Sequence, residues 1–248
     1  MTTFRAKLWT GVGAALLVAA TGCSEKDAGK SSAIAASAAA PSSGPVEAVG
    51  EGGSEGGAQG AFESIPAASK VALRLGQLKG FVLIALRQTD GPDAGGVLLS
   101  QGIQESFDRS PNVYTAAGVD EAILRKAAKT GAPADLKAAL ANIEAAEAKA
   151  GGDRLAVVKG LAEIASGLYG EAVKPGSVDP IDYQHSLGAA MAAQTVLERE
   201  VGKDPRAATA MPEMKKFVAL WPKLSAPETP TPAAQVAAQA SRLELELS

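Results

Sequence analysis

The chain has 248 residues and a net charge of −3, with acidic and basic side chains interleaved along it. A nearly neutral chain without a basic stripe lacks the electrostatic pattern of a nucleic-acid-binding protein, so we expect no nucleic-acid partner. Aromatic residues make up only 4% of the sequence, and there is one cysteine and one histidine. These counts exclude an intrachain disulfide and any zinc motif that needs two histidines.

The N-terminus has the pattern of an export signal. Basic Arg5 and Lys7 precede an apolar run at 8–20, and small residues then lead into Cys23. A basic segment, a short apolar segment and a small-residue cleavage site are the parts of a secretory signal. The apolar run holds about 13 residues, fewer than the ~18 that a membrane-spanning helix needs. We therefore expect residues 1–22 to be a signal peptide that is removed.

The residues before the cysteine resemble a lipobox, the cleavage motif of bacterial lipoproteins. They read Ala20-Thr21-Gly22-Cys23, although lipoboxes usually carry Leu where this chain has Ala20. The resemblance implies that the Cys23 thiol is acylated, with palmitate-type chains holding the protein on the lipid bilayer. Ser24 in the next position, rather than Asp, implies sorting to the periplasmic face of the outer membrane. A plain secretory signal that happens to end near a cysteine is the alternative.

The next segment is composed mainly of Ser, Ala, Gly, Pro and Glu. Such a composition buries too little apolar surface to offset the entropy of ordering the chain. We expect residues 23–62 to be the lipidated cysteine and a flexible linker, and residues 63–248 to be one folded domain. The glycine-rich run 50–57 lacks the Gly-Lys-Ser/Thr of a phosphate-binding loop, so nucleotide binding is not expected.

From Pro66 onward, apolar residues recur every three or four positions, which predicts helices rather than strands. The first helix is the most apolar and is expected at the centre, and Pro212 is a candidate break in a later one. Short links between helices favour antiparallel neighbours. We predict an all-α antiparallel helical bundle after the signal peptide and a disordered tether, with helices near 66–88, 94–107, 120–129, 133–150, 154–173, 180–201, 205–220 and 233–247.

Three helix starts carry explicit capping signals. Asp153, Asp179 and Asp204 are predicted N-caps, because their carboxylates can accept hydrogen bonds from free N–H groups in the first turn. Pro180 and Pro205 follow at the first helical position, where the missing N–H of proline would have had no partner within the helix.

The only histidine, His185, follows Asp182 by three residues and shares a face of the predicted helix with it. The two side chains could ligate a metal ion or form an acid–base pair. The simpler interpretation is that Asp182 interacts with the free N–H groups and dipole of the helix start, and that His185 is a surface or boundary side chain. A carboxylate metal site in a bundle usually takes Glu-x-x-His from several helices, and one histidine cannot complete that set.

Catalytic arrangements have little support. A Ser-His-Asp triad would have to use His185 as its base, Ser186 faces elsewhere on the helix, and no Gly-x-Ser-x-Gly elbow is present. The one thiol is assigned to lipid. We therefore expect the protein not to be an enzyme and assign no catalytic residue.

The architecture as a whole resembles the imelysin-like, iron-uptake-associated proteins of the bacterial periplasm. That family carries a Gly-x-His-x-x-Glu signature, and the nearest segment here is Gly102-Ile103-Gln104-Glu105-Ser106-Phe107. An amide replaces the histidine, and an amide is a poor ligand for transition metals. If the resemblance holds, the iron site is lost or weakened, and Glu105, Asp182 and His185 are the metal-ligating candidates that remain.

Two functions from different classes follow. The favoured one is a membrane-anchored periplasmic lipoprotein whose helical domain is a non-enzymatic structural or partner-interaction module. In it, Glu105, Asp182 and Tyr183 serve solvation, capping and packing, and the partners are the bilayer, through Cys23, and a protein of the envelope. The alternative is a metal (iron) binding module of an uptake system, and a metal ion is the only cofactor that the sequence suggests.

Overall fold

The computed structural model describes residues 56–88 and 94–248. The chain divides into two units, Met1–Ala48 and Val49–Ser248, and every described element belongs to the second. The predicted signal peptide, Cys23 and most of the predicted linker lie outside the described residues. No helix within the described ranges has both the length and the apolar character needed to cross a bilayer.

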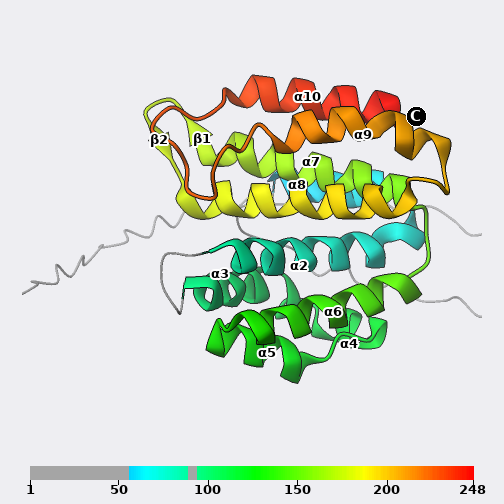
Figure 1. Cartoon of the computed structure of the whole chain (residues 1–248), viewed down its shortest axis with the longest axis vertical. Helices are drawn as coiled ribbons and strands as arrows, with labels where there is room; N and C mark the ends of the chain where they lie inside the picture. Colours follow the sequence, from blue (N-terminus) through cyan, green and yellow to red (C-terminus); the bar gives the residue numbers. More distant parts are fainter. Residues whose placement is uncertain (1–55, 89–93) are drawn as a thin grey trace, which may run out of the picture. The chain divides into compact units, whose positions relative to one another are not determined.

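The described residues fold almost entirely into helices, which confirms the all-α bundle (Figure 1). The elements in chain order are α1 (Gly56–Ser64), the short 3₁₀ turn η1 (Ala67–Ser69), α2 (Lys70–Arg87), α3 (Ala94–Gly102), the π-helical segment η2 (Ile103–Phe107), α4 (Pro111–Ala117), α5 (Glu121–Thr130), α6 (Pro133–Lys149), α7 (Arg154–Ala172), β1 (Val173–Lys174), β2 (Ser177–Val178), α8 (Pro180–Glu200), α9 (Pro205–Val218) and α10 (Ala233–Glu246).

The three predicted N-caps are confirmed. Asp153 Oδ1 accepts hydrogen bonds from the backbone N–H groups of the second and third residues of α7, at 2.8 and 3.3 Å. Asp179 makes the same two bonds at the start of α8, and Asp204 makes one at the start of α9. These carboxylates fix where each helix begins, because they satisfy donors that the helix itself leaves free.

The structure differs from the sequence-based expectation at several boundaries. Helix α1 begins at Gly56, inside the range assigned to the linker, and α4 forms where a loop was expected, with Pro111 at its first position. Pro212 lies inside α9 without splitting it. The two-residue strands β1 and β2 pair antiparallel around a turn in which Gly176 has a φ of +80°, a conformation that favours glycine.

Helix α2 lies at the centre of the packing, as its all-round apolar pattern predicted. It contacts α3, α6, α7 and α8, and Leu73, Leu75, Leu78, Val82 and Ile84 along it are fully buried. Helices α7 and α8 pack along each other, and α9 and α10 cover them on the side away from α2 (Figure 1). In this arrangement α8 packs against α2 near His185, whose ring contacts Phe81 of α2.

Candidate functional site

Two of the three predicted metal residues lie together. Glu105 comes from η2 and His185 from α8, and His185 Nδ1 is 3.0 Å from Glu105 Oε2. The π-helical turn that carries Glu105 is closed by a hydrogen bond from Asp108 N–H to Ile103 C=O at 2.9 Å. A π turn inserts an extra residue into the helix and changes the direction of the side chains around it, and such turns are frequent at functional sites.

The expectation that His185 is a surface or boundary side chain was wrong. Its side chain is only 2% exposed, whereas Glu105 is 37% exposed. The imidazole and the ring of Phe81 pack in a T-shaped arrangement, with ring centroids 4.7 Å apart. Gly102 makes room for that ring, because a Cβ at Gly102 would lie 2.2 Å from Phe81 Cγ. His185 is therefore a core residue, and its ring contacts the partly exposed carboxylate of Glu105.

Asp182 does not join this pair through a hydrogen bond within the described part of the chain. Its backbone N–H donates to the capping carboxylate of Asp179, as expected for a first-turn residue. Burial raises the pKa of Asp182, and the negative charges of Asp179 and Glu105 add to that effect while His185 opposes it. Asp182 thus interacts with the Glu105–His185 pair through its charge.

Among the described residues, Glu105 and His185 form a pair of possible metal ligands rather than a larger group. Across 56–88 and 94–248, no three or more His, Cys, Asp or Glu side chains are grouped so that they could hold one. Glu105 and His185 provide two ligands, and His185 Nε2 is buried without a hydrogen-bond partner in these ranges. Asp182 therefore does not complete a group of three with Glu105 and His185 within these ranges.

A second cluster, which the sequence analysis did not identify, lies where α2, α6 and α8 meet. Lys79 is fully buried, and its Nζ lies 2.8 Å from Oε2 of the buried Glu147. Arg199 donates from Nη1 to the same oxygen at 3.1 Å and also pairs with Glu144. Burial lowers the pKa of Lys79, and the adjacent Glu147 opposes that shift. A lysine inside the most apolar helix was the available signal, because a buried charge needs a partner.

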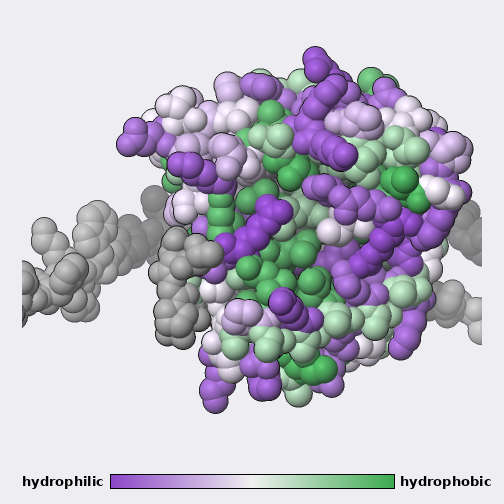
Figure 2. Space-filling model, viewed as in Figure 1, coloured by the Kyte–Doolittle hydropathy of each residue, from purple (hydrophilic) through white to green (hydrophobic). Residues whose placement is uncertain are grey.

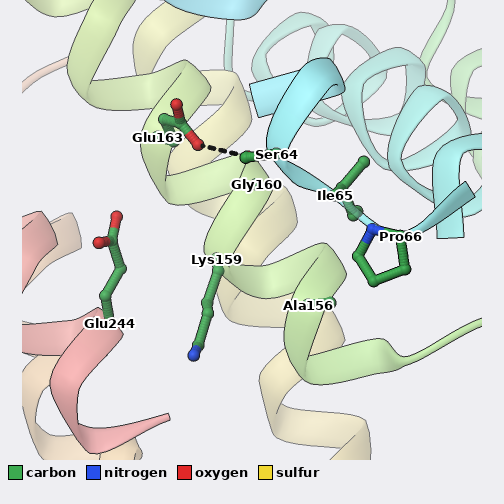
Figure 3. Close-up of a pocket in the computed structure, with 8 residues that line it drawn as sticks. All are labelled: Ser64, Ile65, Pro66, Ala156, Lys159, Gly160, Glu163 and Glu244. Carbon is green, nitrogen blue, oxygen red and sulfur yellow. Dashed lines mark hydrogen bonds between the residues drawn. The ribbon is translucent and has the colours of Figure 1, made fainter. Parts of the chain in front are cut away.

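A surface cavity of about 480 Å³ lies among α1, α7 and α10 (Figure 3). Ser64 Oγ donates to Glu163 Oε2 at 3.2 Å, and Lys159 Nζ lies 2.9 Å from Ser248 Oγ. Burial raises the pKa of Glu244, Glu163 adds to the rise and Lys159 opposes it. Two of the charged groups that line the cavity, Glu163 and Lys159, therefore already have partners from the chain itself.

Apolar side chains also gather on one face between α2 and α8, where Figure 2 shows a predominantly hydrophobic area. A groove of about 360 Å³ lies there, and its apolar lining residues are Leu83, Leu86 and Met191. Its polar lining residues are Arg87, Gln194, Thr195 and Glu198. The groove lies on the α2–α8 pair that also carries His185 and Lys79.

Comparison with known proteins adds no relative to this description: no family model, no curated protein and no solved structure matches the chain.

Proposed function

We propose that the protein is a lipid-anchored, non-enzymatic module of the bacterial cell envelope, held at the periplasmic face of the outer membrane, whose helical domain serves a structural or partner-binding role. The observation that carries the proposal is the sequence Ala20-Thr21-Gly22-Cys23 at the end of an export signal. It is followed by a long segment poor in large apolar residues and then by the helical domain. Acyl chains on Cys23 would hold that domain at a bilayer without a spanning helix.

The position of the only histidine supports a non-catalytic role. A general base must be within hydrogen-bond reach of the proton that it removes from a substrate. His185 is almost fully buried, its Nδ1 faces Glu105 and its ring packs against Phe81. The side chain best suited to base catalysis near neutral pH is therefore committed to contacts within the fold.

The anchor is tested by expressing the full chain and the Cys23→Ala variant in a bacterial host, followed by membrane fractionation and labelling with a fatty-acid analogue. The wild type is expected in the membrane fraction with label, and the variant without label in the soluble envelope fraction. Ser24→Ala is the matched control, because it changes the neighbouring residue and keeps the thiol. Membrane association and labelling that survive Cys23→Ala would disprove lipid anchoring.

The partner-binding role is tested by chemical crosslinking in intact cells. Wild-type protein is expected to form a discrete crosslinked species with an envelope protein, and the unanchored Cys23→Ala variant is expected to form less of it. Crosslinks spread evenly over unrelated proteins would argue against a specific partner.

The contact between Glu105 and His185 favours a second candidate, a metal-binding module. A carboxylate and an imidazole from different elements are ligand types that iron and zinc accept, and bound metal stabilises the native state. Titration of the protein with iron, zinc and copper should then raise its melting temperature, and His185→Ala and Glu105→Gln should each reduce the rise. Asp182→Asn tests the third candidate ligand. An unchanged melting temperature at saturating metal excludes this function.

A further inference from the structure

The groove between α2 and α8 carries one positive and one negative side chain beside its apolar residues. The apolar lining residues are Leu83 and Leu86 of α2 and Met191 of α8. Arg87 of α2 and Glu198 of α8 also line the groove, and both of these residues are exposed. An apolar patch with charged residues at its margin is typical of a surface that binds another protein. The groove is therefore a candidate interface.

The two helices that form the groove run in opposite directions (Figure 1). Near the start of α2, Ala72 lines the same cavity as Lys203, which follows the end of α8. In the second half of α2, Phe81 packs against His185, which lies near the start of α8. The end of α2 therefore lies beside the start of α8, and the end of α8 lies beside the start of α2.

This antiparallel arrangement separates the two charges of the groove. Arg87 is the last residue of α2 and Glu198 is in the last turn of α8, so they lie toward opposite ends of the helix pair. Glu198 accepts a hydrogen bond from the neutral amide of Gln194 at 2.8 Å. Within residues 56–88 and 94–248, neither Arg87 nor Glu198 takes part in an ion pair. Each charge is thus open to a partner of opposite sign.

A second copy of the chain has the charge pattern that these two residues require. In a dimer with twofold symmetry the same patch faces itself, and two different residues meet in reciprocal pairs across the axis. A twofold axis that crosses the middle of the groove sets the two grooves antiparallel. Arg87 of one copy then faces Glu198 of the other, and the same contact recurs at the other end. The apolar residues of the two copies face each other between these contacts.

We propose that the α2–α8 groove is the interface of a homodimer with twofold symmetry. Leu83, Leu86 and Met191 of the two copies pack together at its centre, and Arg87 pairs with Glu198 at each end. The flexible, unbranched side chain of methionine fills gaps in such a contact. The interface belongs to the helical domain and does not depend on the lipid anchor.

Sedimentation velocity tests the dimer, with the full chain in detergent solution and the unanchored Cys23→Ala variant without detergent. Both proteins are expected to show a reversible equilibrium between monomer and dimer over a range of protein concentrations. A monomer at every concentration up to the high micromolar range would overturn the proposal. A dimer of the wild type alone would overturn it as well, because association would then require the acyl chains. Neither result would bear on whether Cys23 is lipidated.

Exchange of the two charges identifies the surface. Arg87→Glu and Glu198→Arg each place like charges at both ends of the dimer. Each is expected to raise the dissociation constant of the dimer roughly tenfold, because two exposed ion pairs become repulsive. The double variant Arg87→Glu/Glu198→Arg restores opposite charges across the axis, so its constant should return to within about twofold of the wild-type value. Single variants that dimerise like the wild type, or a double variant as weak as the singles, would overturn the proposal.

Lys215→Glu is the matched control for Arg87→Glu. Lys215 is exposed on α9 and is not a lining residue of the groove, and its replacement changes the net charge by the same amount. This variant is expected to dimerise like the wild type. Equal weakening by Lys215→Glu and Arg87→Glu would mean that net charge, rather than this groove, governs association, and would overturn the proposal. The melting temperature of each variant separates weaker association from loss of folding.

Discussion

Gly80 of α2 and Gly188 of α8 meet backbone to backbone. A Cβ on Gly80 would lie 2.7 Å from the carbonyl carbon and oxygen of Gly188, and a Cβ on Gly188 would lie 2.8 Å from the Gly80 oxygen. The two helices can approach this closely only because neither residue has a side chain. The contact also places Phe81, next to Gly80, against His185, less than one turn before Gly188.

Gly80→Ala should therefore destabilise the protein, although alanine is the better helix former. The added methyl group would push α2 and α8 apart, and overpacking of this kind costs about 1–3 kcal/mol. The free energy of unfolding, measured with urea, is the test. Gly170→Ala in α7 is the control: a Cβ there would meet nothing within 4 Å. That variant should gain up to about 1 kcal/mol from helix propensity. A loss of stability in the control equal to that of Gly80→Ala would contradict the close-approach explanation.

Much of the fold was predictable because its signals are local. The caps Asp153, Asp179 and Asp204 act on N–H groups two or three residues away, so the sequence alone places them. The contact between Gly80 and Gly188 joins residues far apart in the chain, and a glycine inside a helical pattern does not reveal what it approaches. Helix α4 was missed for a related reason, since a short segment after Ser110-Pro111 has little periodicity to read.

The candidate site was predictable only in part. The sequence pointed to Asp182 as the partner of His185, because residues three apart share a helix face. In the structure His185 instead pairs with Glu105. Glu105 lies on a π-helical turn that no local sequence pattern predicted. Lys79 is a charged residue in an apolar helix, a signal that the sequence analysis did not use, and its partner Glu147 belongs to another element. Tertiary packing decided each of these pairings.

The buried Lys79–Glu147 pair should be far more sensitive to mutation than an exposed pair. Glu147→Gln leaves the Lys79 ammonium buried without its counter-ion, and we expect a loss of about 3–5 kcal/mol. The double variant Lys79→Met/Glu147→Gln should lose less than the sum of the two single changes, because it removes both charges. Lys216→Ala breaks an exposed pair and should cost at most about 1 kcal/mol. Thermal or urea unfolding of the wild type, Lys79→Met, Glu147→Gln and the double variant measures the coupling. Additive losses of unfolding free energy would show that the two residues are not energetically coupled.

The same lysine predicts a pH dependence. The folded-state pKa of Lys79 is lowered below its ordinary value of 10.5 by burial. Between the lowered pKa and 10.5 the unfolded state therefore binds more protons, so the stability from this group rises with pH across that window. Subtracting the unfolding free energy of Lys79→Met from that of the wild type at each pH isolates the effect. The difference should grow toward pH 10.5, and a flat difference would contradict the assigned shift.

Ionisation of Tyr183 should lower the stability of the folded protein as the pH rises above 10, which is the opposite of the effect expected for Lys79. Burial raises its pKa from 10.0 to about 12, and the neighbouring Tyr169 adds to the rise. The folded protein then resists ionisation of the phenol, so the stability from this group is complete below pH 10 and is lost as pH rises toward 12. Tyr183→Phe removes that loss. Between pH 10 and 12, the free energy of unfolding of the variant should therefore fall less steeply than that of the wild type. Urea unfolding at several pH values measures both, and equal slopes against pH would refute the prediction.

Trp221 packs the proline-rich connector that follows α9 against the helical bundle. Its Nε1–H donates to Ser186 Oγ at 2.8 Å, and its ring packs edge-on against Tyr169 and Phe217. Ser186 itself donates to the Tyr183 carbonyl, so the indole completes a buried chain of hydrogen bonds. Trp221→Phe keeps most of the aromatic packing and removes the donor, which should cost about 1–2 kcal/mol.

Ser186→Ala tests the same bond from its other end. If the bond is the main effect, the double variant Trp221→Phe/Ser186→Ala should lose less than the sum of the single variants, because the bond can be lost only once. Near-ultraviolet circular dichroism and urea unfolding of the four proteins provide the measurement. Strict additivity would mean that ring size, rather than the hydrogen bond, holds the connector in place.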